Sequence, residues 1–374
     1  MKQRQSTAFI AQPEKRSSLK KAGVLALSAI GLVLIASLVT GIGVYLFSIK
    51  ISQSTNVAQE TQPPNSEQTP IASKQSPIAF PAKEILRFGS RGTSEGQFSN
   101  PPIVGLGNGD QKILYAADQF NGRIYIFDWN GTLKKQFQLE SKEEIRGLEF
   151  STHFVYVLQG GKILQFSAKI SGEFELKGEI GKKSAGVPVF DTTGKLIGKS
   201  TSASAYSRIC VGKNGLLYAI DEQNYIVRFA EDQRVKDKIQ IDSSSDEPGI
   251  DLAVDESGVI YALIGDEITK IAQNGKRLLF ACLECNSMPI QEIEVDESGL
   301  LYMISNKRFM ERRGASFSSI AVVNTHGKYL GEFGLESGSL IGGFSTVRDT
   351  QNTQVFISRS VGDKIQIVRY EIQN

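Results

Sequence analysis

The chain has 374 residues, of which 40% are apolar and 22% charged, so it has the composition of a folded protein with a sizeable core. The net charge is +2, but residues 1–83 carry a net of +6, which leaves −4 for residues 84–374. A mildly acidic domain excludes a general electrostatic footprint for nucleic acid. Two histidines and three cysteines leave little material for a metal site or a nucleophile–base pair.

A long uncharged run near the N-terminus predicts a membrane span. The 28 residues from Ala22 to Ile49 are mostly Leu, Ile, Val, Ala and Gly, and about 20 apolar residues suffice to cross a bilayer. A cleaved signal peptide fits less well, because its apolar region is about 7–15 residues long and ends at a small-residue cleavage site. We therefore expect residues 22–49 to form a transmembrane signal-anchor helix embedded in the lipid bilayer.

The flanking charges predict the orientation of this span. Six basic residues and one acid, Glu14, precede it: Lys2, Arg4, Lys15, Arg16, Lys20 and Lys21. Because cytoplasmic flanks carry the excess of Lys and Arg, residues 1–21 are predicted to be a basic cytoplasmic tail. Everything after residue 50 would then lie outside the cytoplasm.

The next segment has the composition of a linker. Residues 50–83 are rich in Ser, Gln, Thr, Asn and Pro and hold few large apolar side chains. Such a stretch cannot offset the entropy of ordering. We expect a flexible linker, with an end-to-end distance of roughly 30 Å, that leaves the folded domain near the membrane.

An aromatic residue inside a short apolar run recurs six times after the linker. These anchors are Tyr115, Tyr156, Tyr218, Tyr261, Tyr302 and Phe356, separated by 41, 62, 43, 41 and 54 residues. A period near forty with one aromatic per unit is typical of a β-propeller with four-stranded blades. Residues 84–374 are therefore predicted to be an all-β, six-bladed β-propeller. Spacings of 62 and 54 predict insertions at 181–206 and 306–318, which we expect to be loops on the binding face.

The first unit carries a recognisable motif. It reads Phe88-Gly89, then Gly96-Gln97-Phe98, Tyr115-Ala116-Ala117-Asp118, Asn121-Gly122-Arg123-Ile124 and Phe127-Asp128. This order closely resembles the NHL repeat, although later units share only its pattern. The resemblance implies a protein-interaction platform or an extracellular sensor head. For the single-pass protein expected from residues 22–49, the resemblance implies a bacterial plasma (inner) membrane.

The last unit lacks a fourth strand of its own. Ile365–Tyr370 reads as its third strand, and no further apolar run follows before Asn374. The segment Glu84–Phe88 precedes the first full unit. We expect it to pair with the last blade and close the ring, which removes free sheet edges.

Five polar residues belong to the repeat itself. Asp118 with Asn121, and Asp221 with Asn224, recur at one place in their units, and Arg123 follows the first pair. Their spacing suits side-chain capping of the turn between the first two strands. The alternative is a metal or substrate role at the channel axis.

Cys282 and Cys285 form a Cys-x-x-Cys pair. Outside the cytoplasm they could form a local disulfide, or stay as two idle thiols. A zinc site would need two further ligands, and the remaining candidates stand in distant units: Cys210, His153 and His326. No metal or other cofactor is expected.

One dense basic cluster stands beyond the tail, in the long fifth unit. Four cations surround an aromatic residue: Lys307, Arg308, Phe309, Arg312 and Arg313. The loop could bind anionic headgroups, a cell-wall polymer or an acidic protein. The alternative is an ordinary solvated loop.

Two functions of different classes follow. The main hypothesis is a membrane-tethered binding, scaffold or sensor protein that is not an enzyme and has a protein partner on its propeller. It rests on the tether, the repeat domain and the scarcity of catalytic residue types. The alternative is a metal-dependent propeller hydrolase or lyase, because propellers related to the NHL type include such enzymes. Its site would be built from carboxylates such as Asp118, Asp221 or Asp266.

Overall fold

The structure, a computed structural model, describes most of the chain from residue 79 onward. The described ranges are 79–107, 112–168, 174–181, 185–200, 205–241, 249–265, 267–280, 282, 290–307, 317–334, 338–349 and 352–372. Within them no helix is long and apolar enough to cross a bilayer. The predicted tail, the predicted span at 22–49 and the linker up to residue 78 lie outside these ranges.

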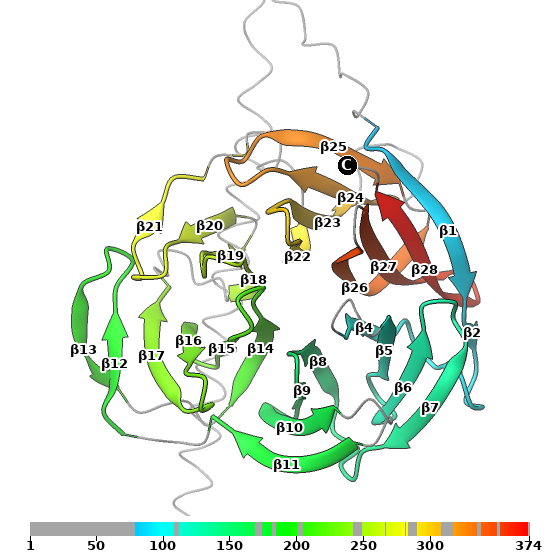
Figure 1. Cartoon of the computed structure of the whole chain (residues 1–374), viewed down its shortest axis with the longest axis horizontal. Helices are drawn as coiled ribbons and strands as arrows, with labels where there is room; N and C mark the ends of the chain where they lie inside the picture. The colour runs from blue at the N-terminus through cyan, green and yellow to red at the C-terminus, as the bar shows by residue number, and fades with distance from the viewer. Residues whose placement is uncertain are drawn as a thin grey trace, which may run out of the picture. The chain divides into compact units, whose positions relative to one another are not determined.

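The described residues form a ring of six blades around a common centre, each blade with four antiparallel strands (Figure 1). Blades one and two are β4 (Ile103–Leu106), β5 (Ile113–Asp118), β6 (Arg123–Asp128) and β7 (Leu133–Gln138), then β8 (Ile145–Phe150), β9 (Phe154–Gln159), β10 (Lys162–Ala168) and β11 (Phe174–Ile180). Blades three and four are β14 (Tyr206–Val211), β15 (Leu217–Asp221), β16 (Tyr225–Phe229) and β17 (Val235–Gln240), then β18 (Gly249–Val254), β19 (Ile260–Ile264), β20 (Glu267–Ile271) and β21 (Arg277–Leu278). Blades five and six are β22 (Ile290–Val295), β23 (Leu301–Lys307), β24 (Phe317–Val323) and β25 (Tyr329–Gly334), then β26 (Ser339–Asp349), β27 (Asn352–Val361), β28 (Lys364–Ile372) and β1 (Ala82–Phe88).

The six-bladed propeller predicted from the aromatic repeat is confirmed. Each anchor lies on the second strand of its blade, from Tyr115 on β5 to Phe356 on β27. All six side chains are buried, with 0–4% of their surface exposed. The repeat therefore marks the strand that is enclosed on both faces by neighbouring blades.

The predicted closure by the first strand is also confirmed. β1 forms the outer edge of blade six and pairs antiparallel with β28, from Ala82 opposite Ile372 to Phe88 opposite Ile367. The strand begins at Ala82, two residues before the expected start at 84. A short two-stranded sheet of β2 (Ser90–Arg91) and β3 (Gln97–Phe98) follows it.

The core consists of six apolar clusters, each shared by two consecutive blades. One joins blades six and one, where Phe356 and Ile367 pack with Tyr125. The next joins blades one and two, and so on round the ring. Because each blade buries its faces against its neighbours, the ring must close before all six clusters are complete.

The first predicted insertion is not a loop on a binding face. Residues 181–206 include a hairpin of β12 (Val187–Phe190) and β13 (Leu196–Ser200) that extends the outer edge of blade three. β12 runs parallel to β17, and the Arg277 amide of blade four donates to the Thr192 carbonyl at 2.7 Å. β-branched and aromatic residues in β12 favour a strand here, and the hairpin connects the outer edges of two blades.

Candidate functional site: the central channel

The innermost strands of five blades share one irregularity. The register of β8, β14, β18, β22 and β26 shifts where one extra residue opposes the second strand. The extra residues are Arg146, Ser207, Ile250, Gln291 and Gly342. Bulges of this kind redirect side chains, and here they occur at the same level of the channel in five successive blades.

Two tiers of residues follow from this register. We define the first tier as the residues just past the bulge, with the equivalent residue of blade one: Ile103, Gly147, Arg208, Asp251, Glu292 and Gly343. The second tier lies two residues further on, so its side chains leave the strand on the same side. It consists of Gly105, Glu149, Cys210, Ala253, Glu294 and Ser345, each directly opposite an aromatic anchor.

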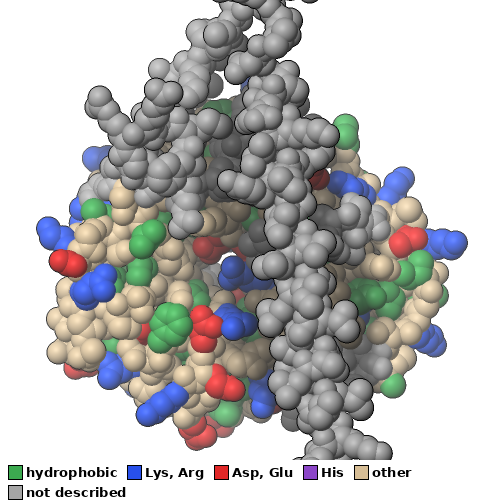
Figure 2. All heavy atoms as spheres, turned by 180° about the vertical axis from the view of Figure 1, so that it is seen from behind, with side chains coloured by type: hydrophobic (Ala, Val, Ile, Leu, Met, Phe, Trp, Pro, Cys, Tyr) green, Lys and Arg blue, Asp and Glu red, His purple; other side chains and the backbone are tan. Residues whose placement is uncertain are grey.

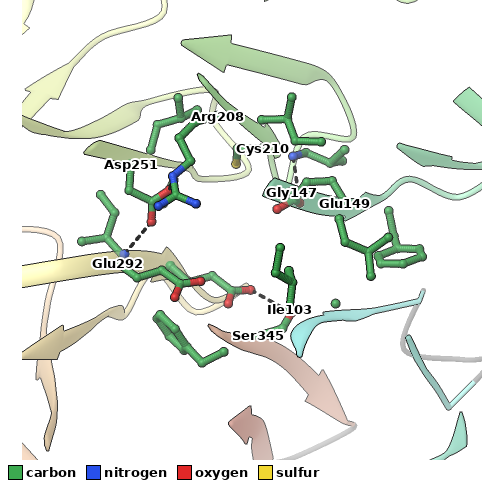
Figure 3. A pocket seen from close by; sticks show the side chains of 18 of the residues that line it. Ile103, Gly147, Glu149, Arg208, Cys210, Asp251, Glu292 and Ser345 are labelled. Carbon is green, nitrogen blue, oxygen red and sulfur yellow. Dashed lines mark hydrogen bonds and ion pairs between the residues drawn. The ribbon is translucent and has the colours of Figure 1, made fainter. Parts of the chain in front are cut away.

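The two tiers surround a cavity of about 1300 Å³ (Figure 3). Its charge is uneven round the ring, since blades two, four and five supply the carboxylates while blades one and six supply small or apolar residues. Figure 2 shows one face of the ring, with acidic and basic side chains next to one another near its centre. The channel is thus a polar cavity inside an apolar ring.

Three channel carboxylates bind main-chain amides of the next blade. The hydrogen bonds are from Val211 N to Glu149 at 3.1 Å, from Ile293 N to Asp251 at 2.8 Å and from Thr346 N to Glu294 at 2.9 Å. Each carboxylate therefore satisfies an inner-strand amide that faces the channel. The acids fix the blades to one another and also present a second oxygen to the cavity.

Three glutamates of the channel, Glu149, Glu292 and Glu294, hold their protons unusually tightly. Burial raises the pKa of Glu149 to about 8, and the nearby Glu294 and Asp251 raise it further. Burial and the adjacent Asp251 likewise raise the pKa of Glu292 to about 8. Burial raises the pKa of Glu294 to about 7, although Lys213 opposes the rise. Three carboxyl groups in one cavity thus titrate near neutral pH, where they can exchange protons with a bound molecule.

Lys213 lies two residues after the end of β14, and its side chain reaches across the channel. Its Nζ lies 3.3 Å from Glu297 Oε1 and 3.8 Å from Glu294 Oε1, both in blade five. It also donates to the Thr346 carbonyl in blade six at 3.1 Å. Burial lowers the pKa of Lys213, but the two glutamates outweigh it and the pKa is raised. The ammonium is therefore charged at neutral pH.

Two further residues of blade three, Arg208 and Cys210, line the cavity. Arg208 lies 3.9 Å from Asp251, with 36% of its side chain exposed. Cys210 is a free thiol whose exposed fraction is 9%, and burial followed by Glu149 and Asp251 raises its pKa well above the usual value. The thiolate, which is the nucleophilic form, is thus disfavoured.

The channel does not have the ligand arrangement of a metal site. Among the residues that the structure describes, no three His, Cys, Asp or Glu side chains converge closely enough to hold an ion. The group that stands among the oxygens of Glu294, Glu297 and Thr346 is the Lys213 ammonium. The metal dependence in the sequence-based alternative therefore does not fit these residues.

Of the polar residues predicted from the repeat, those of the first unit do not line the cavity. Asp118 accepts from Ser99 Oγ at 2.8 Å and Asn121 Nδ2 at 2.9 Å, and Arg123 donates to the Thr93 carbonyl at 2.7 Å. The turn that Asp118 holds connects β5 to β6, the second and third strands, whereas the first and second were expected.

The second pair differs from the first. Asp221 accepts from the Gln223 and Tyr225 amides at 2.9 and 3.0 Å and forms a fully buried ion pair with Lys238 at 2.7 Å. Asn224 adopts a positive φ of 61° in the same turn. Both Asp221 and Asn224 line the cavity near one end, while Asp266 lies outside the described residues.

Two other predicted sites, the Cys282–Cys285 pair and the basic loop that begins at Lys307, lie only partly within the described residues. Cys282 is disulfide-bonded, but Cys285 lies beyond those ranges, so their pairing stays a prediction. Lys307 ends β23. Arg308, Phe309, Arg312 and Arg313 lie outside the described residues, and binding by this loop also stays a prediction.

The sequence did contain a signal for the channel residues that were missed. The aromatic anchors were correctly found, and every second-tier residue stands opposite one of them across the hairpin. Counting back from Tyr302 through the Asp296–Gly299 turn leads to Glu294 and then to Glu292. With the register of the hairpin assigned from the turn, Glu292 and Glu294 could have been predicted to face the channel from the inner strand.

Comparison with known proteins supports the fold and goes no further. No family model and no curated protein sequence matches the chain, so the NHL resemblance is not confirmed. A gluconolactonase from Xanthomonas campestris is similar over 79% of this chain and 99% of its own, with 15% identity and a TM-score of 0.49. Virginiamycin B lyase from Staphylococcus aureus covers 78% and 99%, with 12% identity and a TM-score of 0.47.

A third similar structure is the Pan2 WD40 domain from Neurospora crassa, with 9% identity, a TM-score of 0.47 and coverage of 74% and 90%. The expectation that the chain is not an enzyme is corrected by these comparisons, since enzymes stand among the propellers that it resembles. At such identities the likeness shows the fold alone, so an assignment of function has to rest on the residues of the channel.

Proposed function

We propose that this chain is a propeller enzyme whose active site is the central channel and whose chemistry is general acid–base catalysis. The observation that carries this proposal is the set of Glu149, Glu292 and Glu294, whose pKa values are raised to between about 7 and about 8 in one cavity. Efficient proton transfer requires a catalytic pKa near the working pH.

The two glutamates of β22 divide into a base and an acid. Glu294, whose pKa is the lower and which lies 3.8 Å from the Lys213 ammonium, is the better proton acceptor at neutral pH. Glu292 is largely protonated there because its pKa is about 8. The two side chains are two residues apart on one strand, so they face the same part of the cavity.

Such a pair suits cleavage of a carbon–oxygen bond in a lactone or ester. In hydrolysis, Glu294 takes a proton from water, the water oxygen bonds to the acyl carbon, and Glu292 gives its proton to the leaving oxygen. In elimination, Glu294 takes the proton from a carbon next to a carbonyl, a carbon–carbon double bond forms, and Glu292 again protonates the leaving oxygen. Both routes need an acid and a base of matched pKa.

The cellular setting stays a proposal that rests on the sequence. The 28 uncharged residues at 22–49 and the basic residues before them support a single-pass anchor with the propeller outside the cytoplasm. An anchored enzyme would meet its substrate in the extracytoplasmic space. A protein partner on the propeller remains compatible with this arrangement.

The test uses the full-length chain in detergent with a panel of lactones and aryl esters. Hydrolysis is followed by acid release, and elimination by the ultraviolet absorbance of the conjugated product. Glu292→Gln and Glu294→Gln should each lower kcat by roughly 10²–10⁴-fold. Glu140→Gln, a change at an exposed residue between blades one and two, should leave it unchanged. Turnover that survives both channel substitutions would overturn the proposal.

A further inference from the structure

The contacts of Lys213 resemble those of a bound cation. Its ammonium has oxygen neighbours from two blades: Glu297 Oε1 at 3.3 Å, Glu294 Oε1 at 3.8 Å and the Thr346 carbonyl oxygen at 3.1 Å. Carboxylate and carbonyl oxygens are also the donors that hard divalent ions select. Here the centre of the oxygen set is a nitrogen of the chain itself.

A cation at this point neutralises part of the negative charge of the channel carboxylates. The channel gathers carboxylates from three blades in partly buried positions, and burying unpaired charges is expensive. The side chains of Lys213, Glu294 and Glu297 are 18%, 22% and 28% exposed. They are thus shielded from bulk water but not sealed from it. The Arg348 amide donates to the other oxygen of Glu297 at 2.9 Å, which holds that carboxylate in place.

We propose that the Lys213 ammonium is the resident cation of the channel and takes the place that a divalent metal ion would occupy among these oxygens. The lysine leaves blade three and neutralises carboxylates of blade five, past blade four. It therefore ties the ring together across its interior and leaves the other carboxylates free to hold protons.

The catalytic consequence rests on the proposed function. Lys213 stabilises the ionised form of Glu294, the proposed base, relative to Glu149 and Glu292. Besides Glu149 and Glu292, the titratable groups that interact electrostatically with Glu294 are Cys210 of β14, Tyr302 of β23 and Glu297 just beyond β22. Lys213 forms ion pairs with Glu294 and Glu297, so it acts as a positioning residue for the base.

The experiment measures the melting temperature of the full-length protein against pH, with calcium chloride or with a chelator. Wild-type protein should melt at the same temperature in both. Lys213→Ala should lose stability more steeply than wild type as pH rises through neutrality, because the carboxylates ionise without a counter-charge. Calcium or ethylammonium should restore a large part of this loss. Lys213→Arg, which keeps the charge, should behave like wild type.

Two matched variants keep the test decisive. Glu297→Gln alone should lower the melting temperature less than Lys213→Ala does. When Glu297→Gln is combined with Lys213→Ala, calcium should restore less of the melting temperature than it does in Lys213→Ala alone. The proposal would be overturned if calcium raised the melting temperature of the wild-type protein and this rise disappeared in Glu294→Gln. It would equally be overturned if Lys213→Ala and wild type shared one dependence on pH and cations. Neither readout uses turnover, so an inactive wild-type protein would count against the proposed function alone.

Discussion

Lys213 and Glu297 form an ion pair of 3.3 Å that joins blade three to blade five without passing through blade four. In a propeller the neighbouring blades normally supply one another's contacts. Here a charged contact spans the interior of the ring instead. The same two side chains lie beside Glu294, so the electrostatics of the channel and the stability of the ring depend on common residues.

The first prediction concerns pH and stability. The pKa of Glu149 rises to about 8 on folding, from about 4.3 in an unfolded chain. The folded state therefore binds more protons between these values, and stability falls as pH rises from about 5 to about 8. Glu149→Gln keeps an acceptor for the Val211 amide but cannot ionise, so its melting temperature should fall less steeply with pH. Parallel slopes for both proteins would contradict the assignment.

A second prediction compares two turns of identical sequence, Asp-Glu-Ser-Gly. Asp255 caps its turn through the Ser257 and Val259 amides. Asp296 caps the equivalent turn, and its other oxygen accepts from Tyr302 Oη at 3.0 Å and from Thr353 Oγ1 at 2.9 Å.

Because Thr353 belongs to blade six, Asp296 also joins two blades. Asp255→Ala should cost about 1 kcal/mol, as for the loss of a local cap, and Asp296→Ala about 2–4 kcal/mol, since two buried donors lose a charged acceptor. Chemical denaturation of both variants measures the difference. Equal losses would show that the contact between blades contributes nothing.

A third prediction tests the closure of the ring. Deletion of residues 82–88 removes β1 and exposes the outer edge of β28. The whole domain should then melt several degrees lower and aggregate more readily, because a bare strand edge can pair with other chains. Deletion of an equal length from the linker, at 54–60, is the control and should leave the melting temperature unchanged. A normal melt without β1 would contradict its role.

A fourth prediction concerns Cys210. Because burial raises the pKa of this thiol well above its usual value, it should react very slowly with a thiol-specific disulfide reagent at pH 8 and rapidly once denaturant is added. Cys210→Ser should remove the signal that denaturation releases. Fast labelling of the folded protein would show that the channel admits the reagent and that the thiolate is accessible.

The sequence was sufficient for the architecture because the aromatic anchors obey a period. Tyr115 and its equivalents must fit between two blades, so their spacing survives where the rest of the repeat has diverged. The closing strand was predictable for a related reason, since blade six lacked a fourth strand within its own unit.

The candidate site was not predictable to the same degree. The channel residues differ from blade to blade, from Gly105 to Glu149 to Cys210, so no period identifies them. Their convergence depends on the bulges, and a bulge shows in the register rather than in the composition. Lys213 was hidden for a further reason: it lies 81 residues from Glu294 and 84 from Glu297 along the chain, and only the closed ring brings them together.

The pairing of β1 with β28 also sets an order on synthesis. β1 is the first of the labelled strands to leave the ribosome and its partner β28 is the last, with Ile372 opposite Ala82. During translation at about 5–20 residues per second, β1 waits for many seconds without its partner. The nascent chain therefore holds a partly assembled row of blades with one unpaired strand until β28 emerges. Folding factors that shield a single strand would act on this protein at its N-terminal end.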